Sequence, residues 1–550
     1  MSNRNLKIFL PFIFAIVLAS GILLGLNLNF GKSPAPSEKK FFSIGFDRYD
    51  KLGDIINYIM DSYVDSLDRN ELTQETIFSL LKNLDPHSSY IPASAFREMN
   101  DPLMGSFEGI GIEFNMITDT VVVINPIPGG PSESVGLRAG DRIVKVEEDT
   151  IAGVKMNTQD VVRKLKGPKG TKVTVSVLRR GLEDLMEFTI TRDKIPSYSL
   201  DIAYMIDDET GYIKLGQFSA TTHQEFKLAM ERLKRNGMQQ MILDLRGNGG
   251  GFLEASIQLA DELLAPESLI VYTDGLNRPK THAYARRNGG FETQPLIVLI
   301  DEWSASASEI IAGAVQDHDR GLILGRRSFG KGLVQEQVQL GDGSALRLTV
   351  ARYYTPSGRS IQKPYDNGSE EYFADFMQRM MDGELEHPDS IKNNDSLRFQ
   401  TTAGRTVYGG GGITPDIFIP LQTDERTPYF IKLANRGLIY RFSFDYADNN
   451  RDKLKNFSDA PDFVSNFRVS NAIINAFIEF GKENGVEYNE SEFIAAKGLI
   501  ESQIKAYIGR NIFGNDGFYP VINQNDPAVT RAKEIFKAGD LMSFLVPVAL

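Results

Sequence analysis

The sequence predicts an α/β protein with a mixed-sheet core, an inserted β-rich domain, an N-terminal helical segment and a helical C-terminal extension. Between residues 210 and 350, apolar strand-like runs alternate with helical runs, which is typical of a largely parallel sheet. Residues 105–195 instead show short β-rich runs separated by Gly and Pro turns. Residues 465–508 show helical periodicity. We therefore expect five segments, with the bounds 1–40, 41–100, 101–195, 196–421 and 422–550.

The composition is that of an ordinary globular protein, and it excludes several functions. The 550 residues include 60 Lys+Arg and 72 Asp+Glu, a formal net charge of -12, which argues against a general nucleic-acid binder. The cysteine count is 0, so no disulfide, thiolate zinc site, iron–sulfur cluster or cysteine nucleophile can form. There are only 5 histidines, which limits histidine-based catalysis. We expect no metal, no organic cofactor and no nucleic-acid partner.

An uncharged stretch near the N-terminus, residues 8–26, is close to the ~20 residues that cross a bilayer as a helix. Arg4 and Lys7 precede it, and a positive flank tends to stay cytoplasmic. No clear small-residue cleavage site follows, so we interpret the stretch as an export signal retained as a membrane anchor, with cleavage as the alternative. Residues 31–40 are expected to form a tether. We therefore expect a single N-terminal span in a bacterial inner membrane with the rest of the chain in the periplasm, or an exported protein if the signal is cleaved.

Two helical pieces are expected next, over residues 48–83, because apolar residues recur there at helical spacing. The segment LDPHSSYIP (84–92) follows as a turn-rich break with two prolines. After this break, helical periodicity gives way to the short β-rich runs of the inserted domain.

A glycine-containing loop, GIGI at 109–112, opens the β-rich domain. Its glycines allow successive backbone N–H groups to converge on an anion such as a peptide carboxylate, and the strand that follows offers an edge to an extended peptide. The alternative is a plain β-barrel with glycine turns. With PGGPSESVGLRAGDRI at 128–143, however, the loop resembles that of the PDZ domain family. The resemblance implies a peptide-binding site formed by Gly109, Ile110, Gly111 and Ile112.

Three conspicuous loops follow strands of the α/β core: RGNGGG (246–251), DEWSAS (301–306) and RRSFGKG (326–332). Because ligands bind at the carboxyl ends of parallel strands, we expect these loops to form one site. Glycines in the first loop leave its backbone N–H groups unobstructed. Gly250 or Gly251 is therefore a candidate donor to an oxyanion, and the N–H of Ala307 is the second candidate.

Ser306 lies where a buried strand turns into a helix, and two interpretations are open. With Glu309 it fits the capping box S-x-x-E, in which the serine only caps the helix at a gain of ~1 kcal/mol. Alternatively, Ser306 is a nucleophile whose oxyanion is stabilised by the free N–H groups of the helix start.

A serine nucleophile needs a base. His318 lies twelve residues further along the same helix, about 18 Å away along its axis, and cannot reach; His223 and His282 are not excluded. Lys331 follows a core strand, and burial lowers the pKa of a lysine so that it can act as a neutral base. Its neighbours in the sequence carry no acid. If 331–340 is a strand, Gln335 lies on the same face and can orient the amine without charging it.

Together these features resemble the tail-specific, or C-terminal processing, peptidases, which are serine proteases with a Ser–Lys dyad. The shared segments are LDPHSSY (84–90), the inserted PDZ domain, DLRGNGGG (244–251), SASASEI (304–310), SFGKGLVQ (328–335), TPSGRSIQ (355–362) and GITPD (412–416). The spacing from Ser306 to Lys331 and on to Gln335 also matches. Trp303 and His87 depart from the residue types expected at their positions, but neither belongs to the dyad.

The resemblance implies a serine endopeptidase that cleaves near the C-termini of exported proteins. Ser306 is the implied nucleophile, Lys331 the general base and Gln335 the residue that orients Lys331, while the PDZ domain recognises the substrate's terminal carboxylate. The implied partners are unstructured C-terminal tails and, through the N-terminal helix, a membrane; a homo-oligomer is also considered.

Two other functions fit parts of the sequence. The first is a catalytically silent PDZ scaffold that binds C-terminal tails in the periplasm; the presence of Ser306, Lys331 and Gln335 argues against it. The second is an NTPase, because residues 325–331 fit G-x-x-x-x-G-K. A P-loop needs Ser or Thr next and then a helix, whereas Gly332 and a β-like run follow here.

Beyond residue 420 the sequence predicts helices over 465–482 and 489–508, the second capped by Asn489, and a third that starts at Asp526-Pro527 and ends near Gly539. We expect an appendage that either stabilises the fold or serves dimer contacts, gating or docking.

Overall fold

The computed structural model describes residues 50–539 and 541–544. The chain divides into two compact units, Met1–Thr73 and Gln74–Leu550. The predicted anchor (8–26) and tether (31–40) lie outside the described residues. Among the helices of the described ranges, none is both long and apolar enough to cross a membrane.

The two helical pieces predicted near the N-terminus are confirmed as α2 (Lys51–Ser62) and α3 (Arg69–Lys82). Asp50 caps α2, because its side chain accepts a hydrogen bond from the Gly53 N–H (2.9 Å). The turn-rich segment after α3 leads into β1 (Ser89–Ile91), α4 (Ala93–Asn100) and the 3-10 turn η1 (Pro102–Met104).

The inserted domain is β-rich, as predicted. Its sheet has the order β3-β4-β5-β7-β8, with β6 beside β5, so β3 is an edge strand. The helices are α5 (Pro131–Ser134) and α6 (Thr158–Leu165). The strands are β3 (Ile112–Ile117), β4 (Thr120–Pro126), β5 (Arg142–Val146), β6 (Asp149–Thr150), β7 (Lys172–Leu178) and β8 (Met186–Thr191). The pair formed by β2 (Ser106–Gly109) and β9 (Asp193–Pro196) closes the domain where it joins the core.

The α/β core contains the predicted, largely parallel sheet. Its order is β10-β11-β12-β15-β16-β21; β10 and β11 are antiparallel and every other neighbouring pair is parallel. The strands are β10 (Leu200–Met205), β11 (Thr210–Leu215), β12 (Gln240–Asp244), β15 (Leu296–Ile300), β16 (Leu322–Gly325) and β21 (Ile417–Phe418).

A second, antiparallel sheet lies beside this one in the core. Its order is β1-β18-β13-β14, and β17 also pairs with β18. Its longer strands are β13 (Leu269–Gly275), β14 (Arg278–Tyr284), β17 (Leu333–Gln339) and β18 (Ala345–Tyr354). The predicted strand after Lys331 is therefore confirmed, and the helix that a P-loop requires there is not found.

The core is completed by α10 (Ser369–Met381), the 3-10 turns η2 (Pro388–Ser390) and η3 (Asp395–Leu397), and the small hairpin of β19 (Arg398–Gln400) and β20 (Thr406–Tyr408). These elements lie between β18 and β21 in the chain.

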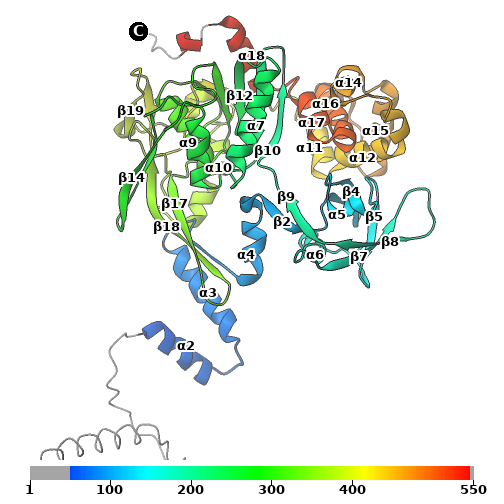
Figure 1. The fold of residues 1–550 in the computed structure, drawn as a ribbon, viewed down its shortest axis with the longest axis horizontal. Helices are drawn as coiled ribbons and strands as arrows, with labels where there is room; N and C mark the ends of the chain where they lie inside the picture. Colours follow the sequence, from blue (N-terminus) through cyan, green and yellow to red (C-terminus); the bar gives the residue numbers. More distant parts are fainter. Residues whose placement is uncertain (1–49, 540, 545–550) are drawn as a thin grey trace, which may run out of the picture. The chain divides into compact units, whose positions relative to one another are not determined.

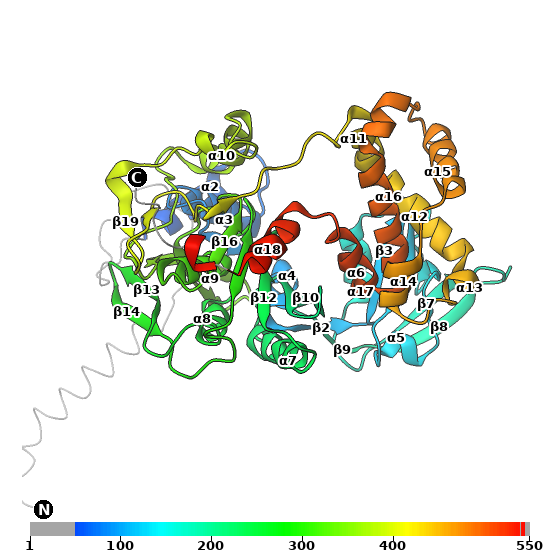
Figure 2. The same cartoon turned by 90° about the horizontal axis from the view of Figure 1, so that it is seen from above.

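The parallel sheet is covered by helices on both faces (Figure 2). On one face, Leu243 and Val298 pack with α7 (Thr222–Arg235), α8 (Leu253–Asp261) and α9 (Ala307–Asp317). On the other face, Ile242 and Ile297 pack with α18 (Pro527–Ala538). Side chains alternate between faces along a strand, so adjacent residues serve different layers.

The position of α18 corrects the expectation that residues 422–550 form one appendage. Its bounds agree with the prediction, since Asp526 caps it and Gly539 follows its end. However, Val529, Ala532 and Ile535 are buried against the parallel sheet. Sequence periodicity identifies the apolar stripe of a helix but not the surface that the stripe covers.

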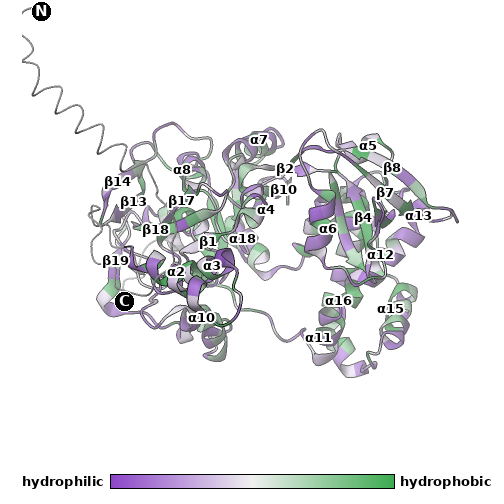
Figure 3. Ribbon diagram, turned by 90° about the horizontal axis from the view of Figure 1, so that it is seen from below, coloured by the Kyte–Doolittle hydropathy of each residue, from purple (hydrophilic) through white to green (hydrophobic). Residues whose placement is uncertain are grey.

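The remaining helices of the extension form a core of their own (Figures 1 and 3), and α15 and α16 confirm two predicted helices. This bundle also contacts the inserted domain, because Phe444 packs against Val122 and Ile124 of β4. The helices are α11 (Pro428–Asn435), α12 (Leu438–Asn449), α13 (Arg451–Leu454), α14 (Ala460–Asn466), α15 (Asn471–Glu483), α16 (Glu490–Phe513) and α17 (Asn515–Ile522); η4 (Leu541–Phe544) follows α18.

Candidate active site

The three loops singled out in the sequence follow β12, β15 and β16, which are neighbouring parallel strands. Their carboxyl ends therefore meet at one edge of the sheet. A cavity of about 390 Å³ lies there, lined by residues that include Gly250, Gly251, Ser306, Lys331 and Gln335. The structure thus brings together five of the six residues predicted for the dyad and the oxyanion site, and Ala307 directly follows Ser306.

Ser306 has a strained backbone. Its φ of 55° and ψ of -112° lie in a region that residues with a Cβ rarely adopt. The turn from β15 into α9 is sharp as a result. Helix capping does not require this conformation, since a capping residue normally has extended backbone angles. The strain therefore favours the nucleophile interpretation of Ser306 over the interpretation as a simple cap.

Glu309 connects the loop of Ser306 to the loop of Lys331. Its fully buried carboxylate accepts hydrogen bonds from the N–H of Ser306 (2.8 Å) and the N–H of Lys331 (2.9 Å) through Oε2. Oε1 accepts from Ser328 Oγ (2.6 Å) and the N–H of Gly330 (2.7 Å). Burial raises the pKa of Glu309 to about 7, although these four donors oppose the shift. One carboxylate therefore sets the distance between the two loops.

Tyr353 supplies a second connection between the same loops. Its hydroxyl oxygen lies 3.1 Å from the carbonyl oxygen of Ser306 and 2.7 Å from that of Lys331, so its single proton can serve either acceptor. The side chain is buried and also lines the cavity.

Lys331 is held as the sequence predicted. Its Nζ donates to Gln335 Oε1 (3.1 Å), and Gln335 Nε2 donates to the carbonyl oxygen of His87 (2.7 Å). Burial lowers the pKa of Lys331, and the positive charge of Arg347 lowers it further. The sequence neighbours of Lys331 carry no acid, but Glu309 and Asp85, which come from other parts of the chain, oppose the shift of its pKa.

Ser306 and Lys331 line the same cavity, but within the described residues no direct hydrogen bond joins Ser306 Oγ to Lys331 Nζ. Catalytic hydrogen bonds are often long before substrate binds and shorten in the complex. The histidines left open by the sequence are engaged elsewhere: His223 Nε2 lies 2.9 Å from Glu262 Oε1, and the ring of His282 packs against Tyr272 on the second sheet.

The glycine loop packs directly against Ser306. A Cβ on Gly250, whose φ is +98°, would lie 2.8 Å from the Cβ of Ser306, so only glycine fits. The N–H of Gly250 donates to Asn248 Oδ1 (2.9 Å). In contrast, no acceptor is found among the described residues for the N–H of Gly251 or of Ala307, the first residue of α9. Gly251 and Ala307 are thus better placed than Gly250 as the predicted donors.

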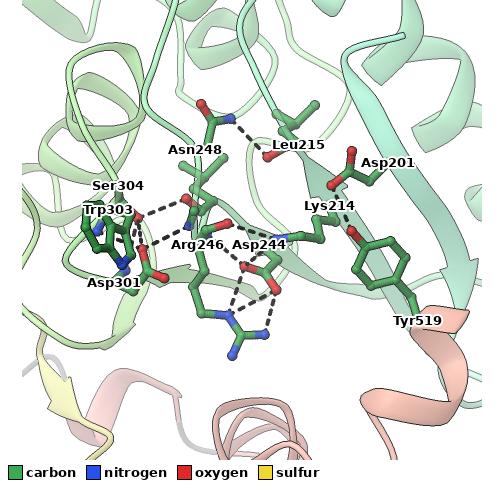
Figure 4. Close-up of polar contacts among 12 residues, drawn as sticks. Asp201, Lys214, Leu215, Asp244, Arg246, Asn248, Asp301, Trp303, Ser304 and Tyr519 are labelled. Carbon is green, nitrogen blue, oxygen red and sulfur yellow. Dashed lines mark hydrogen bonds and ion pairs between the residues drawn. The ribbon is translucent and has the colours of Figure 1, made fainter. Parts of the chain in front are cut away.

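Sequence reasoning missed several residues of this site. The motif S-x-x-E pointed to Glu309 as a capping partner but gave no sign that it binds the Lys331 loop. Asn248 and Tyr353 carried no signal that separates them from ordinary loop and strand residues. Asn248 fixes the glycine loop, because its Nδ2 donates to the carbonyl of Leu215 (3.0 Å), as Figure 4 shows.

The carbonyl groups of the predicted peptide-binding loop are bound within the inserted domain. Gly111 has φ +73°, and its carbonyl accepts from the Ile127 N–H (3.0 Å). The carbonyl of Ile110 accepts from the N–H and the hydroxyl of Ser132 (3.1 and 2.6 Å). Gly109 ends β2 and Ile112 starts β3, the free edge of the sheet. An extended peptide can therefore add to β3.

Comparisons with known proteins agree with this architecture. Residues 209–368 match peptidase family S41, residues 109–190 match the PDZ domain, and residues 429–514 match DUF8443, a family of unknown function. The chain is 38% identical to a carboxy-terminal-processing protease of Bartonella bacilliformis over 317 residues, which are 57% of this chain and 72% of that protein. It is 32% identical over 362 residues to the carboxy-terminal processing protease CtpA of Bacillus subtilis, covering 66% and 76% of the two chains.

The chain belongs to the carboxy-terminal processing proteases of peptidase family S41. It is a serine-type peptidase with an inserted PDZ domain. Among solved structures it is similar to the photosystem II D1 C-terminal processing protease, with 31% identity, a TM-score of 0.34, and coverage of 57% of this chain and 84% of that one.

Replacing Glu309 tests whether one carboxylate holds the peptidase site together. In Glu309→Gln the amide oxygen can replace only one carboxylate oxygen, so two donors would face an NH₂ group. We expect kcat to fall by about 10²-fold and stability by about 1–3 kcal/mol, measured by peptide cleavage and denaturant unfolding. Glu262→Gln, a buried glutamate bound to His223, is the matched control and should keep kcat within about twofold. Equal kcat in both variants would contradict the proposed role of Glu309.

The pH profile tests Lys331 as the base. A lysine accepts a proton only when neutral, so kcat/KM should rise with pH through the lowered pKa of Lys331. Glu309 gains a proton as pH falls through about 7, which adds a loss in the same direction. Arg347→Gln removes a positive charge that lowers the pKa of Lys331. The pKa of Lys331 should therefore rise, and the increase of kcat/KM with pH should occur at higher pH.

Arg398→Gln makes the same charge change at an exposed position and should leave the profile in place. A profile of Arg347→Gln that matches the parent, or that moves to lower pH, would count against Lys331 as the titrating base.

Proposed function

We propose that the peptidase cleaves unstructured C-terminal tails of exported proteins, with Ser306 as nucleophile and Lys331 as general base. The observation that carries the proposal is the cavity shared by both residues, in which the amine of Lys331 is buried and bound to a neutral amide. The names of the relatives, carboxy-terminal processing proteases, support tails as the substrate class.

In the proposed reaction, Ser306 Oγ attacks a peptide carbonyl while Lys331 Nζ takes the hydroxyl proton. The negative charge that forms on the carbonyl oxygen is stabilised by the N–H groups of Gly251 and Ala307. When the tetrahedral intermediate collapses, Lys331 gives its proton to the leaving amine, and the new C-terminal fragment departs. An acyl-enzyme on Ser306 remains.

Lys331, neutral again, then takes a proton from a water that attacks the acyl-enzyme. The second tetrahedral intermediate collapses, the proton returns to Ser306 Oγ, and the shortened substrate is released. Gln335 keeps the lysine aimed at the cavity throughout, because its own amide is fixed by the carbonyl of His87. The chemistry uses only groups of the chain and water.

The PDZ domain is proposed to select the substrate. Its loop of Gly109–Ile112 would bind the terminal carboxylate through backbone N–H groups, and the tail would extend along β3. This contact holds part of the substrate that does not react, so it contributes to binding more than to the chemical step.

Removing either member of the dyad should abolish cleavage of a folded protein that carries an unstructured apolar tail. Ser306→Ala and Lys331→Ala should each lower kcat by at least about 10³-fold, measured by mass spectrometry of the product. Ser396→Ala and Lys280→Ala, which make the same changes at exposed positions, should keep the parent rate. Amidating the tail removes the carboxylate and should raise KM with little change in kcat. Activity that survives Ser306→Ala, or a KM that ignores amidation, would contradict the corresponding part of the proposal.

We also propose that residues 8–26 anchor the peptidase in the inner membrane and that the catalytic part acts in the periplasm. The support is their uncharged length and the positive flank of Arg4 and Lys7. The full chain should stay in the membrane fraction after alkaline carbonate extraction, and deletion of 8–26 should release it. A full chain that is recovered in the soluble fraction would contradict the anchor. A homo-oligomer stays a prediction.

A further inference from the structure

A segment of the C-terminal extension reaches the glycine loop of the active site. Residues 515–538, which form α17 and α18, lie outside the regions that match the peptidase, PDZ and DUF8443 families. Asp526, at the start of α18, nevertheless accepts a hydrogen bond through Oδ2 from Arg246 Nη1 (2.8 Å). Arg246 is the residue directly before the loop 247–251, so this contact joins α18 to the start of the glycine loop.

The two carboxylate oxygens of Asp526 accept from different partners. Its Oδ1 caps α18 by accepting from the N–H groups of Ala528 (2.9 Å) and Val529 (3.0 Å). Its Oδ2 is left for Arg246. The helix that carries Asp526 is fixed on the sheet by buried apolar residues. Because the cap orients the carboxylate, α18 presents Oδ2 to Arg246 from a rigid support.

Arg246 lies in a buried cluster of two acids and two bases, shown in part in Figure 4. Its guanidinium contacts both carboxylate oxygens of Asp244, the nearest at 2.6 Å, and Lys214 Nζ lies 3.7 Å from Asp244. Asp526 supplies the second negative charge, so the cluster holds two negative and two positive groups. Burial alone would raise the pKa of Asp244, but Arg246 and Lys214 hold it well below its usual range.

Hydrogen bonds to the backbone connect this cluster to the loops of the proposed active site. Lys214 Nζ donates to the carbonyl of Arg246 (2.9 Å), and the N–H of Gly247 donates to Asp301 Oδ1 (2.9 Å). One residue further on, the carbonyl of Asn248 accepts from the N–H of Ala305 (3.0 Å) and from Ser308 Oγ (2.9 Å). The glycine loop is thus fixed at Arg246 on one side and beside Ser306 on the other.

We propose that Asp526 is a positioning residue for the peptidase reaction: it holds Arg246, and through Arg246 it fixes the glycine loop 247–251 beside Ser306. The inference rests on the proposed function, because it assigns to this loop a donor for the oxyanion. It makes α18 a part of the active-site support as well as a layer of the core. A displacement of about 1 Å at such a donor is enough to lower a rate by about 10²-fold.

The test compares Asp526→Ser with Asp459→Ser. Serine remains a good helix cap but is too short to cap α18 and also reach Arg246. Asp459 caps α14 by accepting from the N–H of Asp462 (2.9 Å), so Asp459→Ser makes the same chemical change away from the core. We expect kcat on an unstructured tail to fall about 10- to 100-fold in Asp526→Ser with KM within about twofold, and to stay within about twofold in Asp459→Ser.

Folding of each variant is monitored by circular dichroism, because Trp303, the single tryptophan, is half exposed and lies in the loop that leads to Ser306. If Asp526→Ser does not fold, Asp526→Asn keeps the cap through Oδ1 but places an NH₂ group, which cannot accept, opposite Arg246 Nη1, so it should also lower kcat. Asp526→Glu, which restores the acid, should recover part of the rate.

Two further measurements separate positioning from general damage. In an Arg246→Gln background, Asp526→Ser should cause no further loss of kcat, because the contact is already broken. Amide hydrogen exchange of residues 247–251 should be faster in Asp526→Ser than in Asp459→Ser. A parental kcat in folded Asp526→Ser, or additive losses in the double variant, would overturn the proposal. If the parent cleaves no tail, the proposed function fails, and the exchange rates alone decide whether Asp526 holds the loop.

Discussion

The carboxylate of Glu309 is the constraint on which the active site depends. Four donors from two loops converge on it, and two of them are the backbone N–H groups of Ser306 and Lys331. The two residues of the proposed dyad are 25 positions apart in the sequence, yet their main chains share one acceptor atom. Because the carboxylate is fully buried, water cannot replace it, and the loops cannot separate without leaving donors unpaired.

The proposed catalytic groups are supported from several directions. Gln335 and the carbonyl of His87 fix the amine of Lys331, while Asn248 fixes the glycine loop. Behind that loop, Arg246 leads to Asp526 on α18. Burial, which costs free energy for every charged group, is what makes these contacts strong and also what lowers the pKa of Lys331. The support of the site and the activation of its base therefore have one physical origin.

Much of the fold and of the site follows from local sequence patterns. The alternation of apolar strands with helices indicates a parallel sheet, and that sheet brings the loops after β12, β15 and β16 to one edge. The resemblance to the peptidase family points to Ser306, Lys331 and Gln335. The second sheet was missed because β14 is largely exposed and β13, although partly buried, carries no apolar alternation along its length. The place of α18 was missed because an amphipathic stripe does not reveal its partner.

The sequence by itself determined the strands of the parallel sheet, most of the helices, the loop composition and the residue types able to act as nucleophile and base. These depend on neighbours within a few positions, where periodicity, capping and turn chemistry operate. Only the tertiary structure decided that Glu309 joins the two loops, that the N–H of Gly250 is occupied by Asn248, and that Asp526 reaches Arg246 across 280 positions. Such contacts arise from the packing of distant segments, and no local pattern encodes which buried donor will meet which acceptor.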